Sequence, residues 1–330
     1  MYYLYKWCKM KLKEKILNLL NKNQSEYISG EYMAETFNVS RNAVWKAVNA
    51  LRKEGYNIYA VQNKGYILDE GSIFTGDIIK SYLNSPYKLE YIPTVTSTND
   101  IAMEYGKNGV QEDIIIVSNC QTEGRGRKGR KFYSPENAGT YFSILLHPNI
   151  HISDALYITT AAAAAVTKAA KELYNIDTQI KWVNDIYYNN KKICGILTEA
   201  HFDMESGIID YAALGIGINI FEPEESFHKD IKNIAGSAFS RDMFDNKIRC
   251  QLTAKVIDIF YDYYNSLLDM NFLEEYKKRS LLTGKNITIE KNGVKQNALV
   301  LGIDNKCRLN VVFENGIEEN LSSCEVNLKL

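Results

Sequence analysis

The spacing of apolar residues changes twice along the chain, and this change constrains the fold more than any other feature of the sequence. Residues 11–54 carry apolar side chains at the three- and four-residue spacing of amphipathic helices. Residues 78–280 mix helical segments with short apolar runs, and from Asn286 onward short β segments alternate with turns. The 330-residue chain therefore predicts three domains. Their expected boundaries are residues 1–70, 71–282 and 283–330.

The first domain predicts three helices followed by a β-hairpin. The helical segments are residues 11–23, 29–37 and 41–54. Ser29 and Ser40 stand where N-caps are expected, and Gly55 suits the position that ends the third helix. Two strand-like segments, 56–62 and 66–68, are joined by Asn-Lys-Gly. This is the order of a winged helix-turn-helix, whose third helix enters the major groove of DNA.

The predicted third helix has an apolar face, formed by Val44, Val48 and Leu51, and a polar face opposite it. Such a polar face alone is typical of a solvated helix. Residues 1–70, however, hold 11 Lys and Arg against 7 Asp and Glu, although the whole chain has a net charge of −1. The order of elements and this basic excess favour DNA binding. The expected contacts are Ser40, Arg41, Asn42, Trp45, Lys46, Asn49 and Lys64.

Composition excludes several other classes of protein. The uncharged stretch 155–167 is too short to span ~30 Å of hydrocarbon, and no signal peptide is evident, so we expect a cytoplasmic protein without a membrane partner. Met1 and Met10 both remain candidates for the start. The six cysteines form no CxxC pair, which favours reduced thiols over a zinc site. His147 and His151 have helical ligand spacing, but Pro148 between them argues against a helix, so we expect no metal-ligating residues.

The second domain predicts a mixed sheet with helices, after a linker at residues 69–77. Five segments favour strands: residues 114–118, 141–146, 180–188, 193–199 and 212–220. Three segments favour helices: residues 99–106, 154–173 and 247–268. The alanine run 161–165 indicates close packing between a helix and the sheet.

The heptapeptide 124–130, Gly-Arg-Gly-Arg-Lys-Gly-Arg, matches GxGxxG after a predicted strand. A dinucleotide-binding fold would place a helix next, but residues 131–139 have turn composition, and no Gly-Lys-Ser/Thr follows as in a P-loop. Three glycines and four basic residues instead describe a mobile loop that can fold over phosphates. A nonspecific basic patch is the alternative.

Two further segments carry candidate ligand-binding groups. Lys181 begins a predicted buried strand, where an ammonium group needs an anionic partner, either a ligand or Asp185 in a surface pair. Residues 96–99, Thr-Ser-Thr-Asn, precede a predicted helix. They suit an N-cap, which leaves neighbouring hydroxyl and amide groups able to bind a ligand.

These segments occur in the order found in biotin protein ligases. The motifs are Ser97-Thr98-Asn99, Gln121 with Gly124–Arg130, Lys181-Trp-Val-Asn-Asp185, Lys192-x-x-Gly195 and Gly215-Ile-Gly-Ile-Asn219. With the winged helix before them, the chain resembles, over residues 11–329, the bifunctional bacterial type that is also the biotin operon repressor. The resemblance implies an α+β fold with a winged helix-turn-helix, a mixed α/β catalytic domain of the biotin/lipoate ligase type and an SH3-like β-barrel. Val183, Phe132 and Cys324 depart from the usual Pro, Trp and Gly.

The resemblance also implies the activity and its site. The enzyme would form biotinyl-5'-AMP from biotin and ATP with Mg²⁺, and pass biotin to a lysine of the biotin carboxyl carrier protein of acetyl-CoA carboxylase or a related carboxylase. Operator DNA and a ligand-dependent homodimer are the other expected partners. The implied biotin-binding residues are Ser97, Thr98, Asn99, Gln121, Arg125, Gly126, Arg127 and Lys181, of which Lys181, Arg125 and Arg127 are also catalytic. The implied ATP-binding residues are Phe132, Asp185, Lys192 and Asn219.

Two other functions remain open at this point. A lipoate ligase would share the fold class, but the arginine-rich loop is a feature of the biotin type and a winged helix is not expected. A ligand-sensing repressor without catalysis would need neither Lys181 nor the basic loop.

Overall fold

The computed structural model describes residues 11–23, 26–53, 56, 58–69, 73–291, 294–322 and 325–328. The chain divides into two compact units. One comprises Met1–Ser81 with Asp245–Gln251, and the other Tyr82–Phe244 with Leu252–Leu330. Gly55 and Cys324, both named above from the sequence, lie outside the described residues, and so does an Asn-Gly pair at 292–293 in one of the expected turns.

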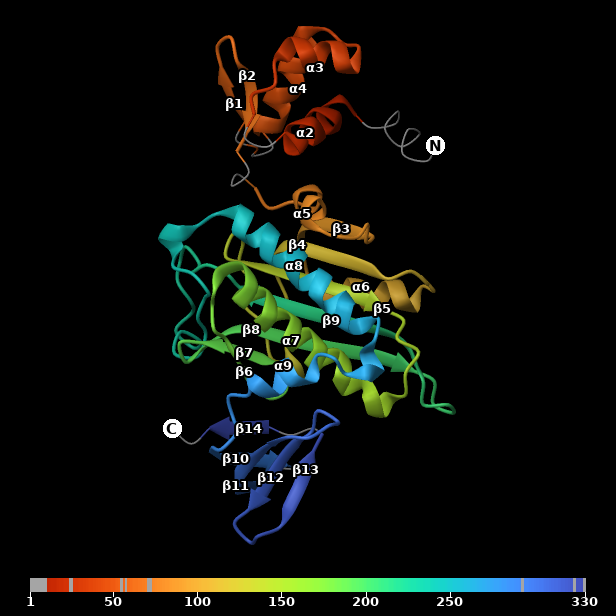
Figure 1. Cartoon of the computed structure of the whole chain (residues 1–330), viewed down its shortest axis with the longest axis vertical. Coiled ribbons are helices and arrows are strands. Elements are labelled where there is room, and N and C mark those ends of the chain that lie inside the picture. Colours follow the sequence, from red (N-terminus) through yellow and green to blue (C-terminus); the bar gives the residue numbers. More distant parts are fainter. Residues whose placement is uncertain are drawn as a thin grey trace. The chain divides into compact units, whose positions relative to one another are not determined.

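The first unit contains the expected winged helix-turn-helix (Figure 1). Its elements are α2 (Leu12–Lys22), α3 (Gly30–Phe37), α4 (Arg41–Lys53), β1 (Ile58–Val61) and β2 (Gly65–Leu68), followed by α5 (Gly76–Tyr82). Ser29 Oγ accepts from the Tyr32 amide and Ser40 Oγ from the Ala43 amide, so both expected caps are confirmed. Val44, Val48 and Leu51 are buried in the core of this unit, which confirms the apolar face of α4.

A third segment, at Ile28, pairs with the hairpin, and the sequence did not indicate this pairing. Ile28 and Tyr66 exchange two backbone hydrogen bonds of 2.8 Å. Gly65 begins β2 with a φ of 114°, and a Cβ there would lie 2.2 Å from the Ile28 carbonyl oxygen. Only glycine fits this crossing, because the backbone passes too close for a side chain.

The second unit is built on a seven-stranded sheet in the order β3-β4-β5-β9-β8-β7-β6 (Figure 1). The strands are β3 (Leu89–Val95), β4 (Ile114–Gln121), β5 (Gly139–Leu146), β6 (Gln179–Lys181), β7 (Asp185–Tyr188), β8 (Lys191–Phe202) and β9 (Ile209–Asn219). Only the β3–β4 pairing is parallel.

Two helices cover opposite faces of this sheet. From α7 (Ala155–Tyr174), Thr159 bonds to the Thr198 hydroxyl on β8, whereas from α6 (Thr98–Lys107), Asn99 bonds to the Glu199 carboxylate. Neighbouring side chains on a strand point to opposite faces, so α6 and α7 lie on different sides of β8. Alanines 161–165 of α7 are fully buried, as expected. The other helices are α8 (Asn246–Tyr264), α9 (Leu273–Lys278) and the short 3₁₀ segments Arg127–Gly129, Ile152–Asp154, Arg241–Met243 and Leu267–Asp269.

A separate five-stranded antiparallel sheet ends the chain, in the order β13-β12-β11-β10-β14. Its strands are β10 (Asn286–Lys291), β11 (Val294–Ile303), β12 (Leu309–Phe313), β13 (Glu318–Leu321) and β14 (Glu325–Leu328). The short β segments expected from Asn286 onward are thus confirmed.

The prediction of a single strand over residues 180–188 is wrong. The chain turns back between β6 and β7, so that Lys181 pairs with Asp185 and ends a strand instead of beginning one. The Trp182 indole N–H donates to the Cys307 carbonyl oxygen, and the Tyr276 hydroxyl donates to that of Val183. These distant partners stabilise a turn that local apolar content does not reveal.

Two further differences concern a helix and a strand that the sequence pattern did not indicate. The end of the expected linker 69–77 already belongs to α5. The edge strand β3 was missed because Pro93 interrupts its strand pattern. No described helix is both long enough and apolar enough to cross a membrane.

Candidate active site

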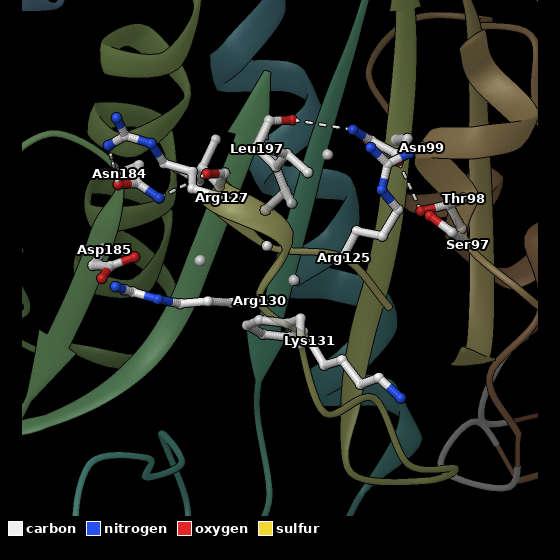
Figure 2. Close-up of a pocket in the computed structure, with 18 of the residues that line it drawn as sticks. Ser97, Thr98, Asn99, Arg125, Arg127, Arg130, Lys131, Asn184, Asp185 and Leu197 are labelled. Atoms are coloured by element: carbon white, nitrogen blue, oxygen red, sulfur yellow. Dashed lines mark hydrogen bonds between the residues drawn. The ribbon is translucent and has the colours of Figure 1, made fainter. Parts of the chain in front are cut away.

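A cavity of about 210 Å³ lies on the α6 side of the sheet, over the middle of β8 and β9 (Figure 2). It collects residues from α6, from the 124–132 loop and from the turn between β6 and β7. Eleven of the twelve residues expected to bind biotin or ATP line it. They are Ser97, Thr98, Asn99, Gln121, Arg125, Gly126, Arg127, Phe132, Lys181, Asp185 and Lys192.

Asn219 is the expected residue that does not line the cavity. The side-chain amide of Asn219 donates to the Gly236 carbonyl oxygen at 3.0 Å, and its backbone carbonyl oxygen accepts from the Ala238 amide. Lys192 exchanges backbone hydrogen bonds with Ile234 and Gly236 in the same segment. Asn219 therefore secures the 234–238 segment beside Lys192.

Glycines make the floor of the cavity. In the antiparallel register Gly195 of β8 lies opposite Gly217 of β9, and Leu197 lies opposite Gly215. A Cβ on Gly217 would come within 2.5 Å of the Phe132 ring, and one on Gly215 within 2.3 Å of the Asn99 amide. The Gly215-Ile-Gly-Ile-Asn219 motif thus has a steric cause, because two side chains lie directly on the backbone of β9.

The end of the cavity at α6 is densely hydrogen-bonded. Gln121 Oε1 accepts from the Thr98 backbone amide at 2.9 Å, and Gln121 Nε2 donates to Ser134 Oγ at 3.0 Å. Ser143 of β5 donates to Asn99 Oδ1 at 2.8 Å and contacts the Thr98 hydroxyl at 2.7 Å. Sequence reasoning missed Ser143, although a lone serine in the apolar run 141–146 is a signal for it.

The basic loop is fixed at both ends by hydrogen bonds. The Gly126 amide donates to the Arg130 carbonyl oxygen at 2.7 Å, and the Phe132 amide donates to that of Gly124 at 2.8 Å. The Arg125 guanidinium binds two carboxylates, Asp100 and Glu199. The hydrogen bond to Asp100 is the largest cause raising the pKa of Arg125 above its usual value, with smaller contributions from Glu199 and an opposing effect of burial.

Arg127 and Arg130 connect the basic loop to the segment around the turn between β6 and β7. Arg127 Nη1 donates to Asn184 Oδ1 at 3.1 Å, and Asn184 Nδ2 donates to the Ile196 carbonyl oxygen. Lys192 Nζ lies 2.6 Å from Asp185 Oδ1, and the Arg130 side chain also points toward Asp185 (Figure 2). The side chains around Asp185 therefore come from three separate segments: the basic loop, the β6–β7 turn with the start of β7, and β8.

Charge is distributed very unevenly around the cavity. Among the described residues that line it, seven are Lys or Arg and one, Asp185, is acidic. A concave surface with this excess of fixed positive charge favours an anionic ligand, and several neighbouring cations suit a polyphosphate. The cavity therefore suits a ligand with a neutral, hydrogen-bonding end and a strongly anionic end.

The expected DNA-contacting residues gather on the surface of the winged helix. Ser40, Arg41, Asn42, Trp45, Lys46 and Lys64 are exposed, and Trp45 keeps 53% of its surface accessible. Asn49 is half-buried, and its Oδ1 accepts from Arg52 at 3.4 Å. The ammonium of Lys64 lies 5.8 Å from the centroid of the Tyr27 ring.

Comparison with known proteins assigns both regions. Residues 91–219 match the biotin/lipoate A/B protein ligase family, and residues 13–67 match an HTH domain. The bifunctional ligase/repressor BirA of Bacillus subtilis strain 168 is 36% identical over 231 residues, which cover 68% of this chain and 70% of that protein. The chain belongs to the family of bifunctional biotin ligase/repressors.

A more distant relative and a solved structure are also similar to this chain. BirA of Escherichia coli K12 is 29% identical over 196 residues, covering 59% of this chain and 60% of that protein. The biotin protein ligase from Aquifex aeolicus in complex with biotin and ATP superposes with a TM-score of 0.60 at 25% identity, covering 73% of this chain and 98% of that one. The expectation of a biotin ligase/repressor is confirmed.

Proposed function

We propose that this protein forms biotinyl-5'-AMP from biotin and ATP, transfers biotin to a lysine of a carrier protein, and represses transcription in response to biotin. The observation that carries the ligase function is the division of one cavity into a hydrogen-bonding end at Thr98 and Gln121, where Arg125 is paired with carboxylates, and a cationic end at Arg127 and Arg130 (Figure 2). Biotin has the same two-part chemistry, with an uncharged ureido ring at one end and a carboxylate at the other. The family membership supports the repressor function.

In this proposal the ureido ring lies at the α6 end of the cavity. Thr98 and Gln121 offer hydrogen-bonding atoms there, and Ser97 Oγ, which accepts from the Asp100 amide as an N-cap, keeps its own hydroxyl proton for a ligand. Asn99 acts differently from its expected role, because both ends of its amide already bind Glu199 and Ser143. It supports the pocket wall instead of contacting the ring.

The first chemical step joins the biotin carboxylate to the nucleotide. A carboxylate oxygen attacks the α-phosphorus of ATP, and the bond to the β-phosphate oxygen breaks to release pyrophosphate. Negative charge grows on the phosphoryl oxygens during this step, so fixed cations stabilise the transition state more than the substrates. We assign this role to Lys181 and Arg127, and nucleotide binding to Phe132, Asp185 and Lys192.

Magnesium fits this site as a companion of ATP. The part of the chain that the structure describes has no group of three His, Cys, Asp or Glu side chains that could hold a metal. Mg²⁺ is commonly held by one or two carboxylates together with substrate phosphates, and Asp185 is the carboxylate at the cavity. When bound, the ion would neutralise phosphate charge; the protein's own part is to hold Asp185 against Lys192.

The second step transfers biotin to the carrier protein. The ε-amine of a lysine on a biotin carboxyl carrier protein attacks the carbonyl carbon of the mixed anhydride. The bond from that carbon to the bridging oxygen breaks, the amine loses a proton, and AMP leaves with the bridging oxygen, which came from the biotin carboxylate. Water competes with this amine, so the loop above the adenylate has to exclude it. The hydrogen bonds at both ends of the 124–132 segment suit such a cover.

The repressor function assigns operator DNA to α4 and the hairpin, and a cytoplasmic location follows for a protein that acts on genes and on carboxylases. Two winged helices bind a palindrome better than one, so we assign a ligand-dependent homodimer to the DNA-bound state. We further propose that the C-terminal sheet is an SH3-like barrel.

One set of assays tests the ligase and its rivals. Pyrophosphate release is measured with ATP and either biotin or lipoate, and transfer is measured to a carrier domain. Pyrophosphate release with biotin but not with lipoate supports the proposal. Release with lipoate but not with biotin identifies a lipoate ligase, and release with neither acid identifies a ligand-sensing repressor. A gel-retardation assay with biotin-gene promoter DNA tests the repressor function. Binding should be weaker in Lys46→Ala and unchanged in Lys22→Ala, whose side chain lies on α2.

A further inference from the structure

A row of buried polar side chains runs from Glu199 on β8 through Asn99 and Ser143 to Thr98. The last three residues are 4%, 0% and 3% exposed, respectively. The hydrogen-bonding atoms of successive members are 2.9, 2.8 and 2.7 Å apart. Buried polar groups are costly when they lack partners, so the proton positions in such a row are determined by its ends.

Glu199 determines the orientation of Asn99. An ionised carboxylate only accepts hydrogen bonds, so Asn99 has to turn its Nδ2 toward Glu199 Oε2. The same amide nitrogen lies 3.4 Å from the Leu197 carbonyl oxygen, which also only accepts. Asn99 Oδ1 therefore faces Ser143.

This orientation determines the direction of the next two hydrogen bonds. Ser143 has one hydroxyl proton and donates it to Asn99 Oδ1 at 2.8 Å. In the 2.7 Å contact between Ser143 and Thr98, the proton must then come from Thr98. The Thr98 hydroxyl also lies 3.2 Å from Gln121 Oε1, but its single proton is used in the shorter contact with Ser143.

Thr98 thus reaches the cavity as a hydrogen-bond acceptor and not as a donor. Its neighbour Gln121 has the opposite character, because Nε2 carries two protons and Ser134 takes one of them. An acceptor beside a donor matches the N–H and C=O groups of a urea. The far end of the row is held by Arg125, which pairs with the second oxygen of Glu199.

We propose that Glu199 is a positioning residue that fixes the direction of this row and thereby makes Thr98 select a ligand N–H. The inference rests on the proposed function, since the ligand N–H belongs to the ureido ring of biotin. A pocket built to pair a ligand N–H discriminates strongly against an analogue that lacks it, because two acceptors then face each other without a proton. Glu199 itself acts through Asn99 and Ser143.

Glu199→Gln should reverse the row. Its side-chain oxygen would remain opposite Arg125, and its amino group would face Asn99. Asn99 then turns its oxygen toward residue 199 and gives up the long 3.4 Å contact of its Nδ2 with the Leu197 carbonyl oxygen. Ser143 would receive a proton from Asn99 and donate to Thr98, so that Thr98 becomes the donor. We expect the KM for biotin to rise ~10- to 100-fold while kcat changes less than ~3-fold, because a wrongly paired buried group weakens ground-state and transition-state binding alike.

The decisive measurement compares biotin with its two cyclic carbamate analogues, each with one ring N–H replaced by oxygen. The wild-type protein should disfavour one of them by ~10²-fold or more in kcat/KM. Glu199→Gln should reduce that ratio at least ~10-fold, which a general loss of packing would not do. An unchanged ratio in a variant that still binds biotin would overturn the proposal.

Ser143→Ala provides the matched control, since it cuts the row between Asn99 and Thr98. It should by itself lower the discrimination, and Glu199→Gln added to it should have little further effect on the ratio. Additive effects contradict the relay, and so does unchanged discrimination in Ser143→Ala, which decides the matter if Glu199→Gln does not fold. A wild-type protein that releases no pyrophosphate with biotin would instead refute the proposed function.

Discussion

Gly195 and Gly217 lie opposite each other on β8 and β9, and the ring of Phe132 lies against both. A Cβ would come within 3.1 Å of the ring from Gly195 and within 2.5 Å from Gly217. The Phe132 ring also packs edge-on with Tyr141, with ring centroids 6.4 Å apart. The absence of two side chains from the sheet therefore gives an aromatic ring a fixed place in the cavity wall, where an adenine can stack on it.

Gly217→Ala should weaken ATP binding. The new methyl group displaces Phe132 from the floor, and the KM for ATP should rise ~10-fold, the equivalent of one aromatic stacking contact. Biotin binding without ATP, followed by calorimetry, should change little because Thr98 and Gln121 lie elsewhere in the cavity.

The control for this variant is Gly217→Ala combined with Phe132→Ala. If the methyl group acts through the ring, the double variant should be no worse than Phe132→Ala alone. A KM for ATP that worsens further in the double variant would show that Gly217 acts in some other way.

Lys181→Ala should reduce pyrophosphate release by ~10²-fold or more, because it removes a fixed positive charge from the cavity where phosphoryl charge develops. The structure supports this choice by bringing Lys181 into the cavity wall, although at the end of β6 and not at the start of a long strand. The measurement is single-turnover pyrophosphate release with saturating biotin and ATP. Lys88→Ala is the control, since its exposed side chain pairs with Glu112 outside the cavity. Near-normal release by folded Lys181→Ala contradicts the assignment.

The sequence predicted best those features that depend on neighbouring residues. Ser29 and Ser40 cap their helices through amides three residues on, and such contacts are visible in a local pattern. The turn at Trp182 was missed because its indole binds a carbonyl 125 residues away, and a run of apolar letters favours a strand when that partner is unknown.

The same reason separates the site residues that were found from those that were missed. Eleven expected residues line one cavity because the family motifs carry them. Glu199 and Ser143 stand outside those motifs, and only the strand register brings them under α6. Asn99 has the expected position, but its polar atoms serve the protein, which a motif alone does not reveal.

Arg125→Gly should release the basic loop from α6 and β8. The guanidinium is the link to Asp100 and Glu199, so its loss lets the loop open while the adenylate is bound. Biotinyl-adenylate should then escape and label an unrelated protein such as albumin. Arg125→Lys keeps the charge without the planar fork that binds two carboxylates, so it should label less than Arg125→Gly and more than wild type. Labelling that stays confined to the carrier domain in Arg125→Gly would show that the loop is no cover.

The last prediction couples the two ends of the chain. A single winged helix makes few base contacts, so a protomer should bind DNA weakly, and two joined heads on a palindrome should bind much more tightly. In the proposed function the adenylate binds in the cavity, against the 124–132 loop and the sheet. It can favour a dimer only by the difference between its affinities for dimer and monomer. We expect a coupling of ~1–3 kcal/mol, which strengthens dimerisation ~5- to 150-fold.

Sedimentation of the protein with biotin and ATP, against protein with ATP alone, measures this shift. Lys181→Ala, which should form little adenylate, is the control and should sediment in both conditions as the wild type does without biotin. An equilibrium that does not respond to biotin and ATP, together with DNA binding that is indifferent to both, would refute the switch and leave the ligase reaction unaffected.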